Sequence, residues 1–112
     1  MKKIYEDLVN LPGAPSFEHR VKEYMKKELT KYTDDIIEDK IGSIFGVLNR
    51  ESDGPKVMLA GHMDEVGFMV SKITDEGYVK FIPAGGWWSQ VMLAQQMEIT
   101  TSEGKRIRGV IG

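Results

Sequence analysis

The residues of this chain best suited to chemistry are a histidine and an aspartate two positions apart, His62 and Asp64. They follow an apolar run at residues 57–60, which Asp53-Gly54-Pro55 and Gly61 bound as a short buried strand. Because side chains alternate faces along an extended chain, His62 and Asp64 are expected to point the same way. At the carboxyl end of a strand, a neutral imidazole can bind a metal ion while a nearby carboxylate fixes its tautomer. The spacing therefore indicates half of a metal site.

The same spacing also has a structural explanation, because a lone histidine near a strand end is more often simply hydrogen-bonded. The context favours the metal, since Gly61 lets the backbone approach closely and two acids stand beside His62. Glu65 is expected to face away from Asp64 and to form a structural salt bridge. His19 falls on the polar face of a predicted helix, where solvent is expected to surround it.

The stretch from Gly61 to Val70, GHMDEVGFMV, resembles the first metal-ligand strand of the dinuclear metallo-aminopeptidases of the glutamyl and deblocking type. Some members of that family carry an older label as cellulases or endoglucanases. The resemblance covers essentially the whole chain, with two departures away from the metal strand: Ala14-Pro15-Ser16 replaces a more usual Ser-Gly, and Ser43 replaces an asparagine. Three further stretches also resemble the family: Leu11-Pro12-Gly13 with Ser16, Glu18 and Val21; Asp39 with Gly42; and Gly85-Gly86-Trp87.

The resemblance implies a centre of two divalent metal ions, zinc or cobalt, that activates a water to remove amino-terminal residues from peptides. It assigns His62 as a metal ligand and Asp64 as the catalytic-site carboxylate that orients the imidazole. It implies that the other ligands and a general-base glutamate lie beyond residue 112, since these enzymes are much longer. We therefore expect an amino-terminal portion that is inactive alone. The resemblance also implies homo-oligomers, in which dimers assemble into a larger hollow particle.

Two other functions stay open beside the aminopeptidase. The first is a non-catalytic binding or oligomerisation module, which predicts a stable folded species of defined stoichiometry. The second is a glycoside hydrolase, which needs two carboxyls about 5–9.5 Å apart flanking a sugar cleft. Only Asp64 and Glu65 are candidates for that pair, and adjacent strand residues face opposite ways. The glycoside hydrolase is therefore disfavoured.

The composition excludes several classes of function. The 15 basic and 17 acidic residues are mixed along the chain, so no electrostatic footprint for nucleic acid is visible. Cysteine is absent, which excludes disulfides, thiolate metal sites and a cysteine nucleophile. No apolar run approaches the ~20 residues of a membrane span. Glu6 and Asp7 interrupt any signal-peptide core. A cytoplasmic protein with no membrane or nucleic-acid partner is expected.

Apolar residues at helical spacing predict two helices at the start of the chain. Ile4, Leu8 and Leu11 place the first over residues 3–10, and a Pro-Gly pair ends it. Ser16 is expected to cap the second helix. The apolar stripe of the second helix is assigned to the core and consists of Phe17, Val21, Tyr24, Met25, Leu29 and Tyr32.

Short strands around turns are predicted for the rest of the chain. Asp39 is expected to cap the first of these turns, and Pro83-Ala84-Gly85-Gly86 is expected to break strand pairing. The pair Trp87-Trp88 is expected to pack against a neighbouring domain or subunit rather than to line a ligand groove. The predicted strands are 36–39 with 43–48, 66–73 with 78–82, and 97–100 with 105–111.

The fold class expected from these elements is α/β, in two parts. Residues 1–70 carry helices and strands of an α/β layer, and the resemblance implies the amino-terminal part of a zinc-exopeptidase-like catalytic domain. Residues 71–112 carry short antiparallel strands with Gly-rich turns, and the resemblance implies the opening strands of an inserted small β-barrel used in dimerisation. Without later partners, those strands are expected to leave unpaired edges.

Overall fold

Two helices open the chain, as the apolar spacing predicts. In the computed structural model of the chain, which describes residues 2–112, α1 is Lys2–Val9 and α2 is His19–Leu29. The hydroxyl of Tyr24 on α2 donates a hydrogen bond to Oδ2 of Asp7 on α1 at 2.8 Å. This hydrogen bond raises the pKa of Tyr24 to about 12. A polar contact therefore joins the two helices.

The start of α2 differs from the prediction. Ser16 does not cap the helix: its φ of 71° is left-handed, and its N–H donates to Oε1 of Glu18 at 2.8 Å. The N–H of Phe17 donates to the carbonyl of Ala14 at 2.8 Å, which closes a turn. Glu18 takes the N-cap position without a side-chain cap. The helix begins later than expected because the backbone of Ser16 is already part of this turn.

The apolar stripe of α2 is only partly covered. Val21 is 7% exposed and is the one hydrophobic side chain classed as buried among residues 2–112. Phe17 and Tyr32, at the two ends of the stripe, are 57% and 72% exposed. The prediction that the whole stripe is core is therefore wrong at its ends. The reason is that α2 packs chiefly against a single short strand, β2.

The first strand pair is an antiparallel hairpin, as predicted, but shorter. β1 is Ile36–Glu38 and β2 is Ile44–Gly46, with Ile37 opposite Phe45. A Cβ added at Gly46 would lie 3.1 Å from Cδ2 of Leu29 at the end of α2. The absence of a side chain at Gly46 lets this hairpin lie directly against the helix.

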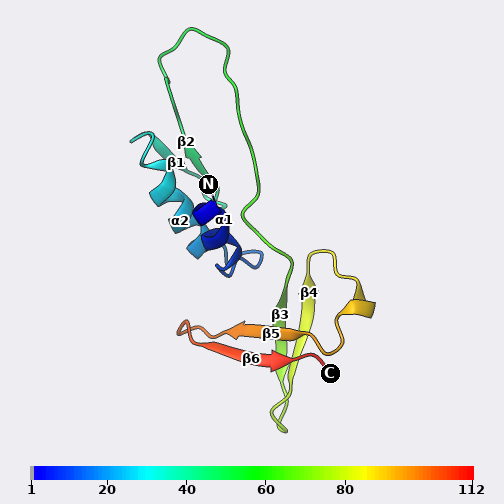
Figure 1. Cartoon of the computed structure of the whole chain (residues 1–112). Helices are drawn as coiled ribbons and strands as arrows, with labels where there is room; N and C mark the ends of the chain where they lie inside the picture. The colour runs from blue at the N-terminus through cyan, green and yellow to red at the C-terminus, as the bar shows by residue number, and fades with distance from the viewer. Residues whose placement is uncertain (1) are drawn as a thin grey trace.

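The predicted buried strand at residues 57–60 is not formed. Residues 47–66 run without helix or strand between β2 and β3, as the long excursion in Figure 1 shows. Val57, Met58 and Leu59 are 81%, 76% and 95% exposed. A buried strand needs a neighbour to pair its N–H and C=O groups, and among residues 2–112 no strand lies beside this run. The apolar run at residues 57–60 predicts a buried strand, but residues 2–112 provide no partner strand for it.

Two further hairpins follow. β3 (Gly67–Ile73) pairs antiparallel with β4 (Val79–Ala84), and β5 (Gln96–Thr100) pairs antiparallel with β6 (Arg106–Val110). A short 3₁₀ turn, η1 (Ser89–Val91), lies between the hairpins. Pairing was expected to break at Pro83-Ala84-Gly85-Gly86, and it does end within this stretch, but only after Ala84: Pro83 still stands opposite Phe68 within the ladder. Each sheet has two strands, so β4 is an edge strand, where proline is tolerated.

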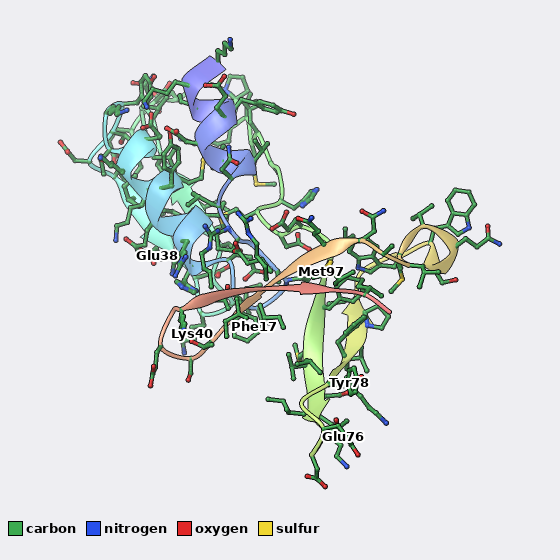
Figure 2. The ribbon with its side chains drawn as sticks, turned by 60° about the horizontal axis from the view of Figure 1, so that its bottom comes forward. Phe17, Glu38, Lys40, Glu76, Tyr78 and Met97 are labelled. Atoms are coloured by element: carbon green, nitrogen blue, oxygen red, sulfur yellow. The ribbon has the colours of Figure 1, made fainter. Side chains whose placement is uncertain are left out.

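The arrangement is elongated, with extents of 62 × 30 × 30 Å. Figure 1 shows the helices and the β1–β2 hairpin at one end, and the two later hairpins crossing at the other. Figure 2 places Glu76 and Tyr78 at the tip of the β3–β4 hairpin, far from the helices. Helices combined with short antiparallel strands confirm the α/β composition. Closure of β3–β6 into a barrel stays a prediction, as does the domain boundary at residue 70, which falls inside β3.

Within residues 2–112, no helix has both the length and the apolar character that crossing a membrane requires.

Candidate metal-ligand site

His62 and Asp64 contact each other in the segment that leads into β3. Nδ1 of His62 lies 2.9 Å from the carbonyl oxygen of Asp64 and 3.0 Å from its Oδ1. With the proton on Nδ1, the ring donates to Asp64 and keeps the lone pair of Nε2 free for a cation. The side chain of His62 is 84% exposed and that of Asp64 is 45% exposed. The geometry is that of one imidazole ligand with its orienting carboxylate.

Glu65 faces a different part of the molecule from this pair. Its N–H donates to the carbonyl of Gly13 at 2.8 Å, and its Oε1 accepts from the N–H of Gly13 at 3.1 Å. A structural role was expected for Glu65, but the expected salt bridge is wrong: no ion pair involves Glu65 among residues 2–112. Its partner is a backbone amide 52 positions earlier in the chain.

Gly13 sits in a confined space between α2 and the His62 segment. A Cβ added there would lie 3.1 Å from Cγ2 of Val21 and 3.2 Å from the carbonyl oxygen of Met63. From the sequence, Gly13 is expected to end the first helix and belongs to one of the stretches that resemble the family. Nothing in its local pattern indicated the contact with Glu65, because the two residues meet only in the tertiary structure.

The donor set at this site is incomplete. Among residues 2–112, no group of three or more His, Cys, Asp and Glu side chains lies close enough together to hold a metal ion. A catalytic zinc site uses about three protein ligands. His62 and Asp64 therefore fit a metal centre as one ligand and its hydrogen-bond partner, and the described residues do not supply the rest. His19, the first residue of α2, is exposed, as predicted.

Asp39 caps the turn between β1 and β2, as expected. Its Oδ1 accepts hydrogen bonds from the N–H groups of Ile41 at 3.0 Å and Ser43 at 2.8 Å. Desolvation raises the pKa of the Asp39 carboxyl, but the hydrogen bonds from Ser43, Ile41 and Gly42 outweigh it, so the net shift is downward. The structure gives this carboxylate a local structural role.

The two tryptophans have separate environments. Nε1 of Trp87 donates to the carbonyl of Gly67 at 2.9 Å, and its ring stacks on Phe68 with centroids 4.5 Å apart. Phe68 in turn meets Phe81 edge-on at 4.6 Å. The expected packing of the pair against a neighbour is therefore wrong for Trp87, which packs on its own hairpin. Trp88 is 67% exposed, and an interface role for it stays a prediction.

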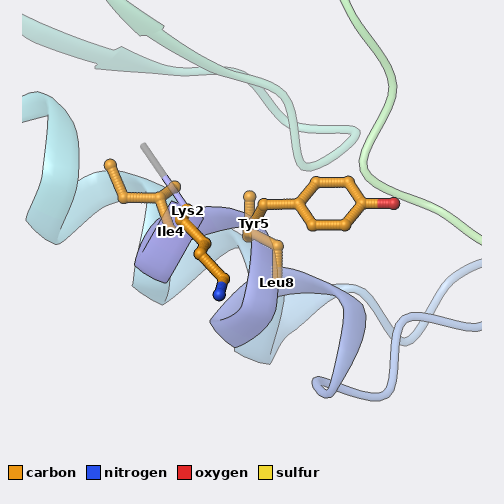
Figure 3. A pocket seen from close by; sticks show the side chains of 4 residues that line it. All are labelled: Lys2, Ile4, Tyr5 and Leu8. Carbon is orange, nitrogen blue, oxygen red and sulfur yellow. The ribbon is translucent and has the colours of Figure 1, made fainter.

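Away from His62 and Asp64, a hollow of about 490 Å³ lies along α1 and is shown in Figure 3. Its lining is Lys2, Ile4, Tyr5 and Leu8, all from one helix. It contains no histidine or carboxylate. This open apolar face offers no chemistry comparable to that of His62 and Asp64.

The sequence of this chain is similar to a family profile and to individual known proteins. The sequence profile of the M42 glutamyl aminopeptidase family matches residues 42–112. The lysyl aminopeptidase of Pyrococcus furiosus (strain ATCC 43587) is 34% identical over an aligned length of 113 residues, and the alignment covers 100% of this chain and 31% of the relative. The glutamyl aminopeptidase of Lactococcus lactis subsp. cremoris is 35% identical over 106 residues, 94% of this chain and 30% of the relative. The chain thus spans about 30% of the length of these relatives.

Solved structures agree with the sequence relatives. The TET aminopeptidase of Thaumarchaeota archaeon SCGC AB-539-E09 matches with a TM-score of 0.90 and 38% identity, covering 97% of this chain and 30% of that one. PhTET1-12s, solved with a dodecamer in the asymmetric unit, matches with a TM-score of 0.85 and 28% identity, covering 98% and 32%. The elongated arrangement of the 112 residues is therefore similar to a segment of those larger chains.

Proposed function

This chain belongs to the M42 glutamyl aminopeptidase family, and from that premise we propose that it forms the amino-terminal part of a metal-dependent enzyme that removes amino-terminal residues from peptides. The observation that carries the proposal is the hydrogen-bonded pair His62–Asp64 within the family match. The aminopeptidase names of the relatives support the reaction class.

In this proposal His62 binds a divalent cation through Nε2, and Asp64 holds the ring by accepting from Nδ1. Accepting that hydrogen bond fixes the tautomer and makes Nε2 a better donor. Imidazole and carboxylate ligands suit zinc and cobalt, and we propose two such ions in the complete centre. When bound, the metal lowers the pKa of a water so that hydroxide forms near neutral pH. Further ligands and a general base come from outside these 112 residues.

We also propose that the complete protein is a homo-oligomer built from dimers. The dodecamer of PhTET1-12s supports this assembly, and so do the many exposed apolar side chains of the β3–β6 region, among them Ile73, Tyr78, Trp88 and Val110. A barrel completed by β3–β6, a domain boundary near residue 70 and a cytoplasmic location stay predictions.

The glycoside-hydrolase alternative gains no support from the site. Asp64 contacts His62, whereas Glu65 contacts Gly13, so the two carboxylates do not face a common space. The non-catalytic module stays open as the alternative, and metal binding by the complete protein separates it from the enzyme.

The test uses the complete natural protein and two variants of the pair. His62→Ala is expected to lose bound metal and hydrolysis of aminoacyl substrates, because no other group in this segment replaces Nε2. Asp64→Asn is expected to weaken metal binding by about 10–100-fold, the usual effect of removing a ligand's hydrogen-bond partner. Metal content by mass spectrometry and the rate of aminoacyl-nitroanilide hydrolysis are the measurements.

His19→Ala is the matched control, since His19 is an exposed histidine on α2 and should leave both readings unchanged. Wild-type metal content and activity in His62→Ala would overturn the proposed role of His62.

A further inference from the structure

The segment that carries His62 has few restraints of its own. Residues 57–66 form neither helix nor strand, and among residues 2–112 the His62 ring forms hydrogen bonds only with Asp64, its near neighbour in the chain. A metal ligand must be held in place before the metal arrives, because ordering a mobile ligand reduces affinity. Some other contact must therefore fix where this segment lies.

That contact is made by Glu65 with Gly13. The main-chain N–H of Glu65 donates to the Gly13 carbonyl at 2.8 Å, and the Glu65 carboxylate accepts from the Gly13 N–H at 3.1 Å. The two hydrogen bonds join residues 52 positions apart, and each residue donates one bond and accepts the other. Two bonds at a single residue fix both the position and the rotation of the chain there.

The surroundings of Gly13 make this contact specific. Gly13 is buried, and a Cβ there would meet Val21 of α2 on one side and the carbonyl oxygen of Met63 on the other. Helix α2 and the His62 segment thus both lie close to Gly13. The backbone carbonyl of Met63 and both the N–H and the carboxylate of Glu65 face Gly13, whereas the side chains of His62 and Asp64 contact each other.

We infer that Glu65 is a positioning residue, which holds the His62–Asp64 pair at the metal centre by clamping its segment to Gly13. The inference rests on the proposed function, because positioning matters only if His62 binds metal. Glu65 itself touches neither metal nor substrate. Glutamine keeps the acceptor oxygen that the Gly13 amide needs, so Glu65→Gln preserves both hydrogen bonds. Glu65→Ala keeps the main-chain hydrogen bond to the Gly13 carbonyl and removes the side-chain hydrogen bond from the Gly13 N–H, so half of the clamp is lost.

The experiment compares these two variants in the complete protein, with Co²⁺ as the probe. Glu65→Ala is expected to weaken Co²⁺ binding by about 10–100-fold, in the range found for residues that orient metal ligands, and to change the visible absorption of the bound cobalt. It should also speed hydrogen exchange in the peptide that spans residues 61–67. Glu65→Gln is expected to restore affinity, spectrum and exchange to within a few-fold of wild type.

Glu103→Ala, at the exposed β5–β6 turn, is the control for loss of a surface carboxylate, and His62→Ala in the same titration tests the proposed function itself. Loss of Co²⁺ by His62→Ala with unchanged binding and spectrum in Glu65→Ala would overturn the positioning role while leaving the proposed function intact. Retention of Co²⁺ by His62→Ala would overturn both. Equal loss in Glu65→Ala and Glu65→Gln would show that the carboxylate charge, and not the clamp, is what matters.

Discussion

At the scale of single residues, a few glycines determine which chain segments can approach each other. Gly85, directly after β4, has a φ of +93°, and a Cβ there would lie 2.9 Å from Cγ1 of Val66. Val66 immediately precedes β3 in the chain. The close approach at Gly85 therefore helps to define where the segment that carries His62 enters the β3–β4 hairpin.

Gly85→Ala is expected to destabilise this region for two reasons. A side chain at positive φ costs about 1 kcal/mol or more, and overpacking against Val66 adds typically about 1–3 kcal/mol. Gly77→Ala is the matched control, because Gly77 has a similar φ of +87° but no atom within 4 Å of the added Cβ. Thermal unfolding of the complete protein should show a larger loss for Gly85→Ala; equal losses would contradict the steric argument.

At the scale of elements, α2 and β1 are joined by ion pairs. Glu38 on β1 accepts from Nζ of Lys26 at 2.6 Å and from Nζ of Lys22 at 3.1 Å, both on α2. Figure 2 shows Glu38 beside that helix. Hydrogen bonds from Lys26 and then Lys22 lower the pKa of the Glu38 carboxyl below its ordinary value of 4.5.

A lowered pKa means that folding favours the ionised carboxylate. The stabilisation by Glu38 is therefore fully present above pH 4.5 and is lost as the pH falls through the lower folded-state pKa. Glu38→Gln should remove this part of the pH dependence, so its melting temperature should approach that of wild type as the pH falls from 6 to 3. The contribution should also shrink at high salt, because these side chains are partly exposed.

Glu103→Gln, which changes an exposed carboxylate in the β5–β6 turn, should keep the wild-type pH profile. A Glu38→Gln profile parallel to wild type across that range would show that the ion pairs add nothing to stability.

At the scale of the whole molecule, the chain exposes far more surface than a compact domain. The accessible surface is 9570 Å², whereas a compact folded chain of this length exposes about 6,200 Å². The radius of gyration is 18.0 Å, against about 13 Å for a compact domain of the same length. Exposed Val57, Met58 and Leu59 belong to this excess surface. The arrangement therefore needs other chain segments or copies to cover it.

These 112 residues expressed alone are expected to bind an apolar dye, to associate, and to hydrolyse no aminoacyl substrate even with added zinc or cobalt. The physical reasons are the uncovered apolar surface and the single imidazole ligand of the site. Light scattering after size-exclusion chromatography, dye fluorescence and a nitroanilide assay are the measurements. Chelator-sensitive hydrolysis by the purified chain, or a compact monomer without dye binding, would contradict this expectation.

Features set by neighbouring residues could be predicted from the sequence. Apolar spacing predicted α1 and α2, and alternation with Gly-containing turns predicted all three hairpins. The contact between His62 and Asp64 follows from a separation of two in an extended chain, and the turn role of Asp39 follows from a local hydrogen-bond pattern. In each case the interacting groups lie within a few positions of one another, so their distance depends little on the rest of the fold.

Features that depend on distant partners were decided by the tertiary structure. The apolar run at residues 57–60 predicts a buried strand, yet burial requires neighbours that the sequence of the run does not contain. The sequence predicts an interface role for Trp87, whereas in the structure its ring stacks on Phe68 and its Nε1 donates to the Gly67 carbonyl. The clamp between Gly13 and Glu65 joins residues 52 positions apart. Local sequence thus determined the helices, the hairpins and the contact between His62 and Asp64, whereas chain folding over long separations decided what covers these elements and which residues the His62 segment contacts.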